Sequence, residues 1–167
     1  IALLREIQKD TGGFTELVPL SFVHTDSPLF LNNPNSVRPG PTDHEVDLMH
    51  SVSRIMLNGF IDNIQVSWTK LGAERARNML SLGVNDLGGT LMNESISRSA
   101  GSKHGQEITA AELCEIIRSA GRIPVRRNTI YKTIDIYKDH DPIDVIPLVE
   151  RKSDPLNFLK MFPETAE

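Results

Sequence analysis

Residues 83–98 read GVNDLGGTLMNESISR, an apolar stretch that runs into paired glycines and then into a dense set of polar side chains. Glycines lack a Cβ atom, so they suit a sharp backbone turn or the close approach of a ligand. The pattern predicts a buried strand from Val84 to about Met92 that opens into a binding loop at Gly88 and Gly89. A tight turn with solvated polar residues fits equally well, because short glycine motifs often occur by chance.

Two further strands are expected upstream of this run. Residues 14–24 and 61–69 are rich in apolar and β-branched side chains, a composition that favours strands. Pro19 has no amide proton to donate within a sheet, so we expect an irregularity in the first of these strands. The proline-rich segment from about residue 25 to residue 41 is predicted to be a long loop.

Helices are expected before and between the strands. Thr42 with Glu45, and Thr109 with Glu112, match the capping box that marks a helix start. They predict helices over residues 42–58 and from residue 109 to about residue 121, and shorter helices are expected at residues 2–9 and 72–82. Within residues 42–58, apolar side chains recur at helical spacing at Val46, Met49, Val52 and Met56. Alternating helices and strands predict parallel strands joined by right-handed helical crossovers.

The number of strands limits the fold. Three parallel strands alone leave open edges and uncovered faces, whereas a complete eight-unit barrel needs about 250 residues. The chain has 167 residues and begins with Ile1 rather than Met. We therefore expect an α/β fold in which residues 1–132 form the last three β/α units of a TIM-type barrel, as a piece of a longer protein. Residues 133–167, with four prolines, are expected to form an irregular tail.

Composition excludes several classes of function. A net charge of −4 gives no general attraction to nucleic acid or to an anionic membrane. No apolar run approaches the roughly 20 residues of a membrane span, and no signal-peptide pattern follows Ile1, so we expect a cytoplasmic protein. Cys114 is the single cysteine. It excludes a disulfide within the chain and a metal cluster held by cysteines of this chain. Its helical stripe with Leu113 and Ile117 places it in the core.

The strand at residues 61–69 carries an unusual polar face. Alternation places Ile64, Val66 and Trp68 on one face, and the polar residues Gln65, Ser67 and Thr69 on the other. Barrel interiors favour Val, Ile and Leu, and buried polar groups need partners, which a polar ligand would supply. Alternatively, this strand is an edge whose polar face lies in water.

Two further sets of residues are weaker candidates. His24 ends its predicted strand on the carboxyl side, where barrel active sites lie, and there it could bind a ligand or transfer a proton. A histidine on a rim loop is the alternative. Four basic residues follow the last predicted helix, and in an acidic chain we expect them to form a solvated face. They are Arg122, Arg126, Arg127 and Lys132.

Three segments resemble a known family. Residues 18–24, 61–72 and 83–98, the last followed by Gly101 and by His104 with Gly105, closely resemble the C-terminal part of deazaflavin (FO) synthase, a radical S-adenosylmethionine (SAM) enzyme. The similarity covers about residues 1–130 and is greatest to the half that joins tyrosine to a ribitylaminouracil. It implies a radical SAM barrel that transfers the 4-hydroxybenzyl group of L-tyrosine to 5-amino-6-(D-ribitylamino)uracil, forming the FO precursor.

The resemblance also implies a set of site residues. Substrate contacts are implied for His24, Gln65, Ser67, Asp86, Gly88, Gly89, Thr90, Asn93 and Glu94. Cofactor contacts, to SAM, are implied for Pro19, Leu20 and Phe22. The family also uses an iron–sulfur cluster held by three cysteines of a CxxxCxxC motif, which is absent from this sequence. The implied partners are the small-molecule substrates tyrosine and ribitylaminouracil and the N-terminal half of the barrel, with no nucleic acid and no membrane.

Other functions stay open at this point. A non-catalytic half-barrel module that works only with the missing N-terminal half would have the same sequence features. So would a related radical SAM enzyme of menaquinone biosynthesis. A third alternative is a phosphate-binding barrel in which the glycine loop binds phosphate. Because the cluster needs several cysteines, we expect the 167-residue chain alone to be inactive.

Overall fold

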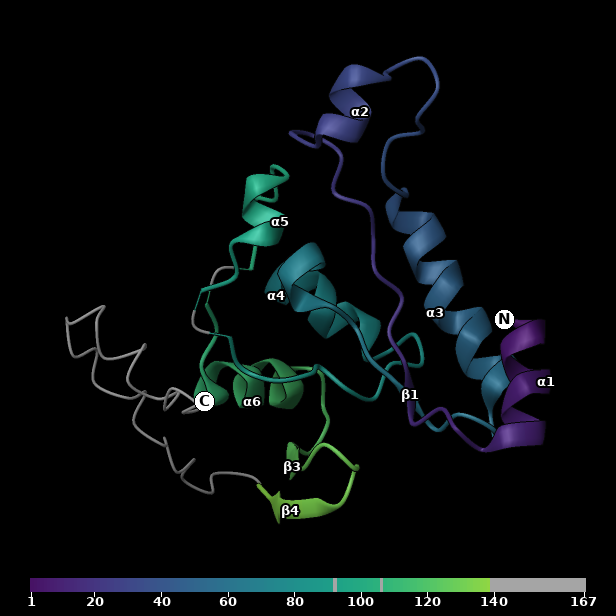
Figure 1. Cartoon of the computed structure of the whole chain (residues 1–167). Coiled ribbons are helices and arrows are strands. Elements are labelled where there is room, and N and C mark those ends of the chain that lie inside the picture. Colours follow the sequence, from purple (N-terminus) through teal and green to yellow (C-terminus); the bar gives the residue numbers. More distant parts are fainter. Residues whose placement is uncertain (92, 106, 139–167) are drawn as a thin grey trace, which may run out of the picture.

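A computed structural model describes residues 1–91, 93–105 and 107–138 (Figure 1). In the first half of the chain, the elements are α1 (Ala2–Thr11), β1 (Glu16–Leu17), α2 (Pro28–Asn32), α3 (Asp43–Leu57) and β2 (Asn63–Ile64). In the second half they are α4 (Trp68–Met79), α5 (Ile96–Ser99), α6 (Ala110–Ser119), β3 (Val125–Arg127) and β4 (Thr133–Ile136). The elements α1, β1, α3, β2 and α4 follow the predicted order of helix and strand, with the short helix α2 added between β1 and α3.

The strand layer has the predicted order and direction. β1 pairs in parallel with β2, with Glu16 opposite Asn63. One residue beyond β2, Gln65 forms a parallel bridge with Asp86 of the third predicted strand. The segment at residues 63–65 therefore has a neighbour on each side, and the alternative that it is a sheet edge is wrong.

The strands are much shorter than predicted. Sheet pairing ends at Leu17, two residues before Pro19, which has no amide proton to donate. α4 begins at Trp68, so Ser67 is its N-cap residue and Thr69 lies in its first turn rather than in a strand. Residues 84–91 contain only isolated bridges, because Gly88 adopts a left-handed φ of 75° that turns the backbone out of the layer.

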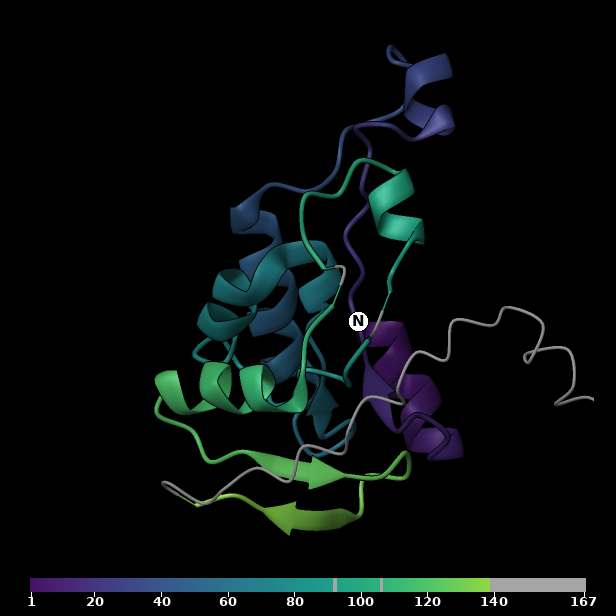
Figure 2. The same cartoon turned by 90° about the vertical axis from the view of Figure 1, so that its left-hand side faces the viewer.

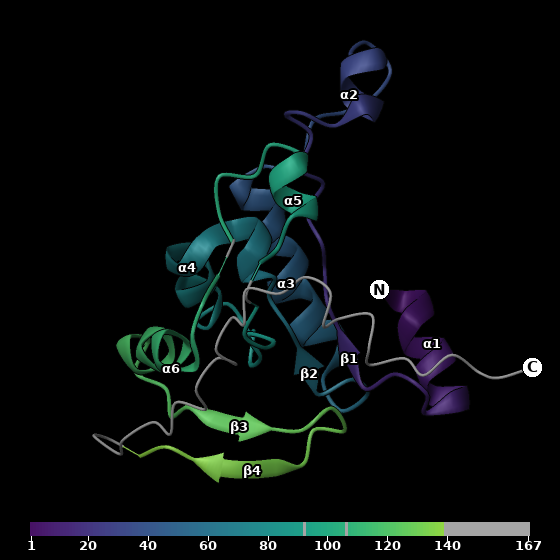
Figure 3. The same cartoon turned by 60° about the vertical axis from the view of Figure 1, so that its left-hand side comes forward.

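The three longer helices after β1 pack around one core (Figures 2 and 3). Ile64 and Val66 are fully buried and pack with residues of α3, α4 and α6, which confirms the predicted alternation of that strand. Burying an aliphatic side chain of this size stabilises a fold by about 1.5–3 kcal/mol. The core contains Val46, Ile64, Val66, Trp68, Ala76, Met79, Leu80, Val84, Leu87, Ile108 and Leu113.

Both predicted capping boxes are confirmed, but the predicted buried face of α3 is partly wrong. Val46 is buried as expected, whereas Met49 and Val52 are 46% and 38% exposed. The helix instead buries His50, Ser53 and Leu57. Burial of the His50 ring is tolerated because its Nδ1 atom lies 2.8 Å from the Val46 carbonyl oxygen in the same helix.

The C-terminal region contains a hairpin that we did not predict from the sequence. β3 pairs antiparallel with β4, so the expectation of an irregular tail is wrong for Thr133–Ile136. The rest of the predicted tail, residues 139–167, lies outside the described residues. The hairpin lies across the end of the layer at which β1 begins, whereas α2 and α5 lie at the opposite end (Figures 1 and 3). No helix in the described part of the chain could cross a membrane.

Candidate functional site

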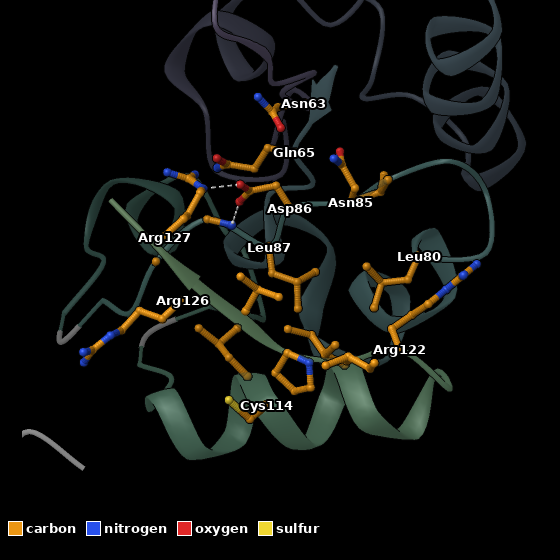
Figure 4. Close-up of a pocket in the computed structure, with 18 of the residues that line it drawn as sticks. Asn63, Gln65, Leu80, Asn85, Asp86, Leu87, Cys114, Arg122, Arg126 and Arg127 are labelled. Carbon is orange, nitrogen blue, oxygen red and sulfur yellow. Dashed lines mark hydrogen bonds and ion pairs between the residues drawn. The ribbon is translucent and has the colours of Figure 1, made fainter. Parts of the chain in front are cut away.

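A cavity of about 1450 Å³ lies between the strand layer, α6 and the β3–β4 hairpin (Figure 4). It brings together five of the predicted site residues, namely Gln65, Asp86, Gly88, Gly89 and Thr90. Gln65 stands between the buried Ile64 and Val66, so alternation turns its side chain to the opposite face, where it meets the cavity beside its bridge partner Asp86. The polar face of the middle strand therefore opens into a cavity rather than into the core.

Asp86 is the most restrained polar group of this cavity. The residue is 9% exposed, and its side-chain Oδ1 atom accepts the Gly88 N–H at 2.5 Å. Its Oδ2 atom accepts from the Nε atom of Arg127 (Figure 4). The hydrogen bond to Asp86 raises the pKa of the Arg127 guanidinium. The solvated role expected for Arg127 is therefore wrong, because this residue forms an ion pair inside the cavity wall.

The Gln65 side chain, unlike that of Asp86, is not held by hydrogen bonds to its described neighbours. Among the described residues, none forms a hydrogen bond with its side-chain amide. The glycine loop lies directly against that amide: a Cβ atom added to Gly88 would lie 2.8 Å from Gln65 Nε2. A carboxamide both donates and accepts hydrogen bonds. Its capacity is therefore available to a ligand in the cavity.

Gly89 and Thr90 extend the same wall. Both are exposed, and an added Cβ atom at Gly89 would meet nothing within 4 Å. The Gly89 carbonyl accepts the Trp68 indole N–H at 3.2 Å, which ties the loop to the start of α4. The loop is thus fixed from behind and open toward the cavity.

His24 lies in a different place from Gln65. It lines a smaller cavity of about 280 Å³ at the start of α4, together with Phe22 and Lys70. Its Nδ1 atom accepts the Gly40 N–H at 3.0 Å, and its ring packs edge-on against Phe30. His24 and Gln65, both among the implied substrate contacts, therefore line different cavities.

Glu94 serves the start of α5. Its carboxylate accepts the Ser97 N–H at 3.0 Å, and Lys70 donates to the Ser97 hydroxyl. Desolvation acts to raise the pKa of Glu94, but the hydrogen bonds from Ser97 and the charge of Lys70 outweigh it and hold that pKa below its ordinary value. Glu94 and its neighbour Asn93 line neither cavity. The structure therefore does not bring these two predicted residues to Gln65.

The remaining predicted residues lie at the carboxyl side of the short strands. Ser67 occupies the N-cap position of α4 without a side-chain capping hydrogen bond, and its hydroxyl lies 2.9 Å from that of Thr69. Pro19, Leu20 and Phe22 follow β1 in an unpaired stretch, and the Leu20 side chain is 66% exposed. Leu20 therefore offers an uncovered apolar surface at the end of the layer where a cofactor contact is expected.

The described residues do not fit an iron–sulfur cluster. Cys114 is buried in the core, as predicted, and burial raises the pKa of its thiol. A thiol held in its protonated form is a poor metal ligand. In the part of the chain that the structure describes, no group of three His, Cys, Asp or Glu residues could hold a metal ion.

Comparisons with known proteins show which proteins this chain resembles. The chain is 52% identical over 149 residues to FO synthase of Nocardia farcinica, covering 89% of this chain and 16% of that protein. It is 54% identical over 129 residues to FO synthase of Mycobacterium tuberculosis, with 77% and 15% covered. It is 49% identical over 134 residues to the 5-amino-6-(D-ribitylamino)uracil–L-tyrosine 4-hydroxyphenyl transferase of Methanopyrus kandleri, with 80% and 36% covered.

The chain thus spans well under half the length of each of these relatives. Residues 11–140 match the family described as the CofH/MqnC C-terminal region. That match includes the strand layer, the glycine loop, α6 and the hairpin, so it covers every wall of the larger cavity. The resemblance found in the sequence is confirmed, and the chain belongs to the CofH/MqnC C-terminal region family.

Proposed function

We propose that this chain is the C-terminal portion of a radical SAM transferase, in which residues 1–132 complete a TIM-type barrel. The whole enzyme transfers the 4-hydroxybenzyl group of L-tyrosine to 5-amino-6-(D-ribitylamino)uracil and forms the FO precursor. The observation that carries this proposal is identity of about 50% over most of the chain to proteins named for FO synthesis and for that transfer. A radical SAM enzyme of menaquinone biosynthesis is the second candidate.

The larger cavity supports the uracil as the ligand on this side. A uracil ring presents alternating donors and acceptors, which a carboxamide can match with both of its groups. Gln65 offers an unengaged amide there, and Gly89 leaves space beside it. We assign Gln65, Asp86, Gly88, Gly89 and Thr90 to the uracil and ribityl groups, with Asp86 orienting the loop.

The smaller cavity and the stretch after β1 support a second binding region. We assign Pro19, Leu20, Phe22 and His24 to SAM or tyrosine, because they lie at the carboxyl end of the layer, where barrel active sites form. Ser67, Asn93 and Glu94 are proposed to shape the rim between the two regions. In the whole enzyme, SAM would supply the radical that fragments tyrosine. The cluster must be held by another part of the protein.

The partner of this chain is then the N-terminal half of the barrel. Among the described residues, β1 pairs only with β2. A parallel strand on the other side of β1 would continue the layer and cover Leu20. The proposed enzyme therefore needs both halves for a closed site.

The test uses the full-length protein, reconstituted anaerobically with iron and sulfide and supplied with a reductant, SAM, tyrosine and the aminouracil. The expected result is a product whose mass equals the aminouracil plus the tyrosine-derived fragment, together with 5′-deoxyadenosine. The 167-residue chain treated in the same way should give no 5′-deoxyadenosine, because one cysteine cannot hold the cluster. SAM cleavage without any aminouracil-derived product would overturn the proposal and favour the second candidate.

A further inference from the structure

The turn of the β3–β4 hairpin places Tyr131 in the wall of the larger cavity. The Asn128 side chain accepts the N–H groups of Ile130 and Lys132 at 3.1 and 2.9 Å. Tyr131 itself adopts a left-handed φ of 61°, a backbone conformation that residues other than glycine rarely occupy. Such a conformation persists only where the surroundings enforce it. The turn therefore fixes the direction of the Tyr131 ring.

Tyr131 in turn fixes Arg127. The guanidinium carbon of Arg127 lies 3.9 Å from the centre of the Tyr131 ring, which is a cation–π contact. The Tyr131 hydroxyl donates to Glu16 of β1, while Arg127 donates to Asp86. The pair therefore spans the strand layer from β1 to the third segment, across Gln65 of the middle one.

The contacts continue from Arg127 to the glycine loop. Asp86 accepts the Gly88 N–H at 2.5 Å, and Gly88 lies against the Gln65 amide. Without Arg127, the Asp86 carboxylate would lose its cationic partner while remaining largely buried, which is costly. The Gln65 amide lies beside Asp86 on the same cavity wall (Figure 4), and no described residue forms a hydrogen bond with it. The carboxylate would then compete with the ligand for that amide.

We propose that Arg127 is a positioning residue for the aminouracil site: it holds Asp86, and through Asp86 it keeps the glycine loop in place and the Gln65 amide free for the ligand. This inference rests on the function proposed above. It adds Arg127, from the hairpin that follows α6, to the residues proposed for the aminouracil site. Arg127 acts through Asp86 and needs no contact with the substrate.

The test measures aminouracil affinity in the full-length enzyme by calorimetry, and KM and kcat by product formation. Arg127→Gln is expected to raise both the dissociation constant and the KM for the aminouracil about tenfold, the size of one lost hydrogen bond. KM for SAM and kcat should change less than about twofold, and Arg127→Lys should restore part of the affinity. The matched control is Arg126→Gln, on the same hairpin. Arg126 forms an ion pair with Asp135 and points away from Asp86 (Figure 4), so the aminouracil affinity of the Arg126→Gln enzyme should stay near wild type.

A double variant separates positioning from general support of the fold. If Arg127 acts through Asp86, then Asp86→Asn with Arg127→Gln binds the aminouracil no more weakly than Asp86→Asn alone. Additive losses, or wild-type affinity in Arg127→Gln, overturn the inference. Should Arg127→Gln not fold, Tyr131→Phe replaces it: about threefold weaker affinity supports the inference, and unchanged affinity overturns it. Wild-type enzyme that does not bind the aminouracil contradicts the proposed function itself.

Discussion

Gly88→Ala tests whether the glycine loop is a site or a simple turn. Gly88 has a φ of 75°, and placing an L-residue in that region costs about 1–2 kcal/mol. The new Cβ atom would lie 2.8 Å from Gln65 Nε2, so the amide must move out to the 3.4 Å or more of an ordinary contact. Because Gln65 is a flexible side chain, it moves rather than the backbone. We expect a fall in melting temperature of roughly 2–8 °C in a unit of this size.

The neighbouring glycine provides the control. Gly89 does not have a positive φ, and an added Cβ atom there would meet nothing within 4 Å, so Gly89→Ala should change the melting temperature by less than about 1 °C. In the full-length enzyme, the displaced amide of Gly88→Ala should weaken aminouracil binding about tenfold. Equal melting temperatures in the two variants, or wild-type affinity in Gly88→Ala, would refute the reasoning.

Three further predictions concern the loop, its packing and the core. Gly89→Val adds a branched side chain to open cavity space, so product formation by the full-length enzyme should be lost while its iron content is unchanged. Gly105→Ala would place a Cβ atom 2.2 Å from the Thr69 Cα atom, and we expect the free energy of unfolding in urea to fall by about 3 kcal/mol. Gly12 is also left-handed, but its added Cβ atom would meet nothing within 4 Å, so Gly12→Ala should cost only about 1 kcal/mol. Desolvation lowers the pKa of His50, so below about pH 6.5 the unfolded chain binds a proton that the folded chain does not. The unfolding free energy should therefore decrease as the pH is lowered below that value. His50→Gln should remove this pH dependence, while His44→Gln should leave it unchanged.

Local physics explains what could be predicted from the sequence. A capping box closes within four residues, so Thr42 with Glu45 needed no knowledge of the rest of the fold. The alternation that buries Ile64 and Val66 is likewise a property of one short segment. The parallel order of the three segments followed from helices between them. Each of these features depends on neighbours in the sequence.

Features that depend on neighbours in space were missed. The start of α4 at Trp68 could not be seen, because the strand pattern of residues 61–69 continues through it. The buried face of α3 was misplaced, since Met49 is more apolar than His50 and only tertiary packing selects the latter. Propensity and pattern are overridden in both cases by contacts between elements.

The hairpin is the case with the largest consequence for function. Arg127 stands in a basic run within an acidic chain, where charge counting predicts a solvated face. Its partner, Asp86, lies 41 residues away, and the Tyr131 hydroxyl meets Glu16 across 115 residues. No local pattern reports pairings at such separations. One sequence signal was available: apolar β-branched residues at Val125 and at Ile134 and Ile136 flank a short polar turn, which favours a hairpin. A hairpin at that position turns Arg127 from a solvated charge into part of the cavity wall. The wall of the larger cavity therefore includes residues of the hairpin after α6 as well as the three strand segments.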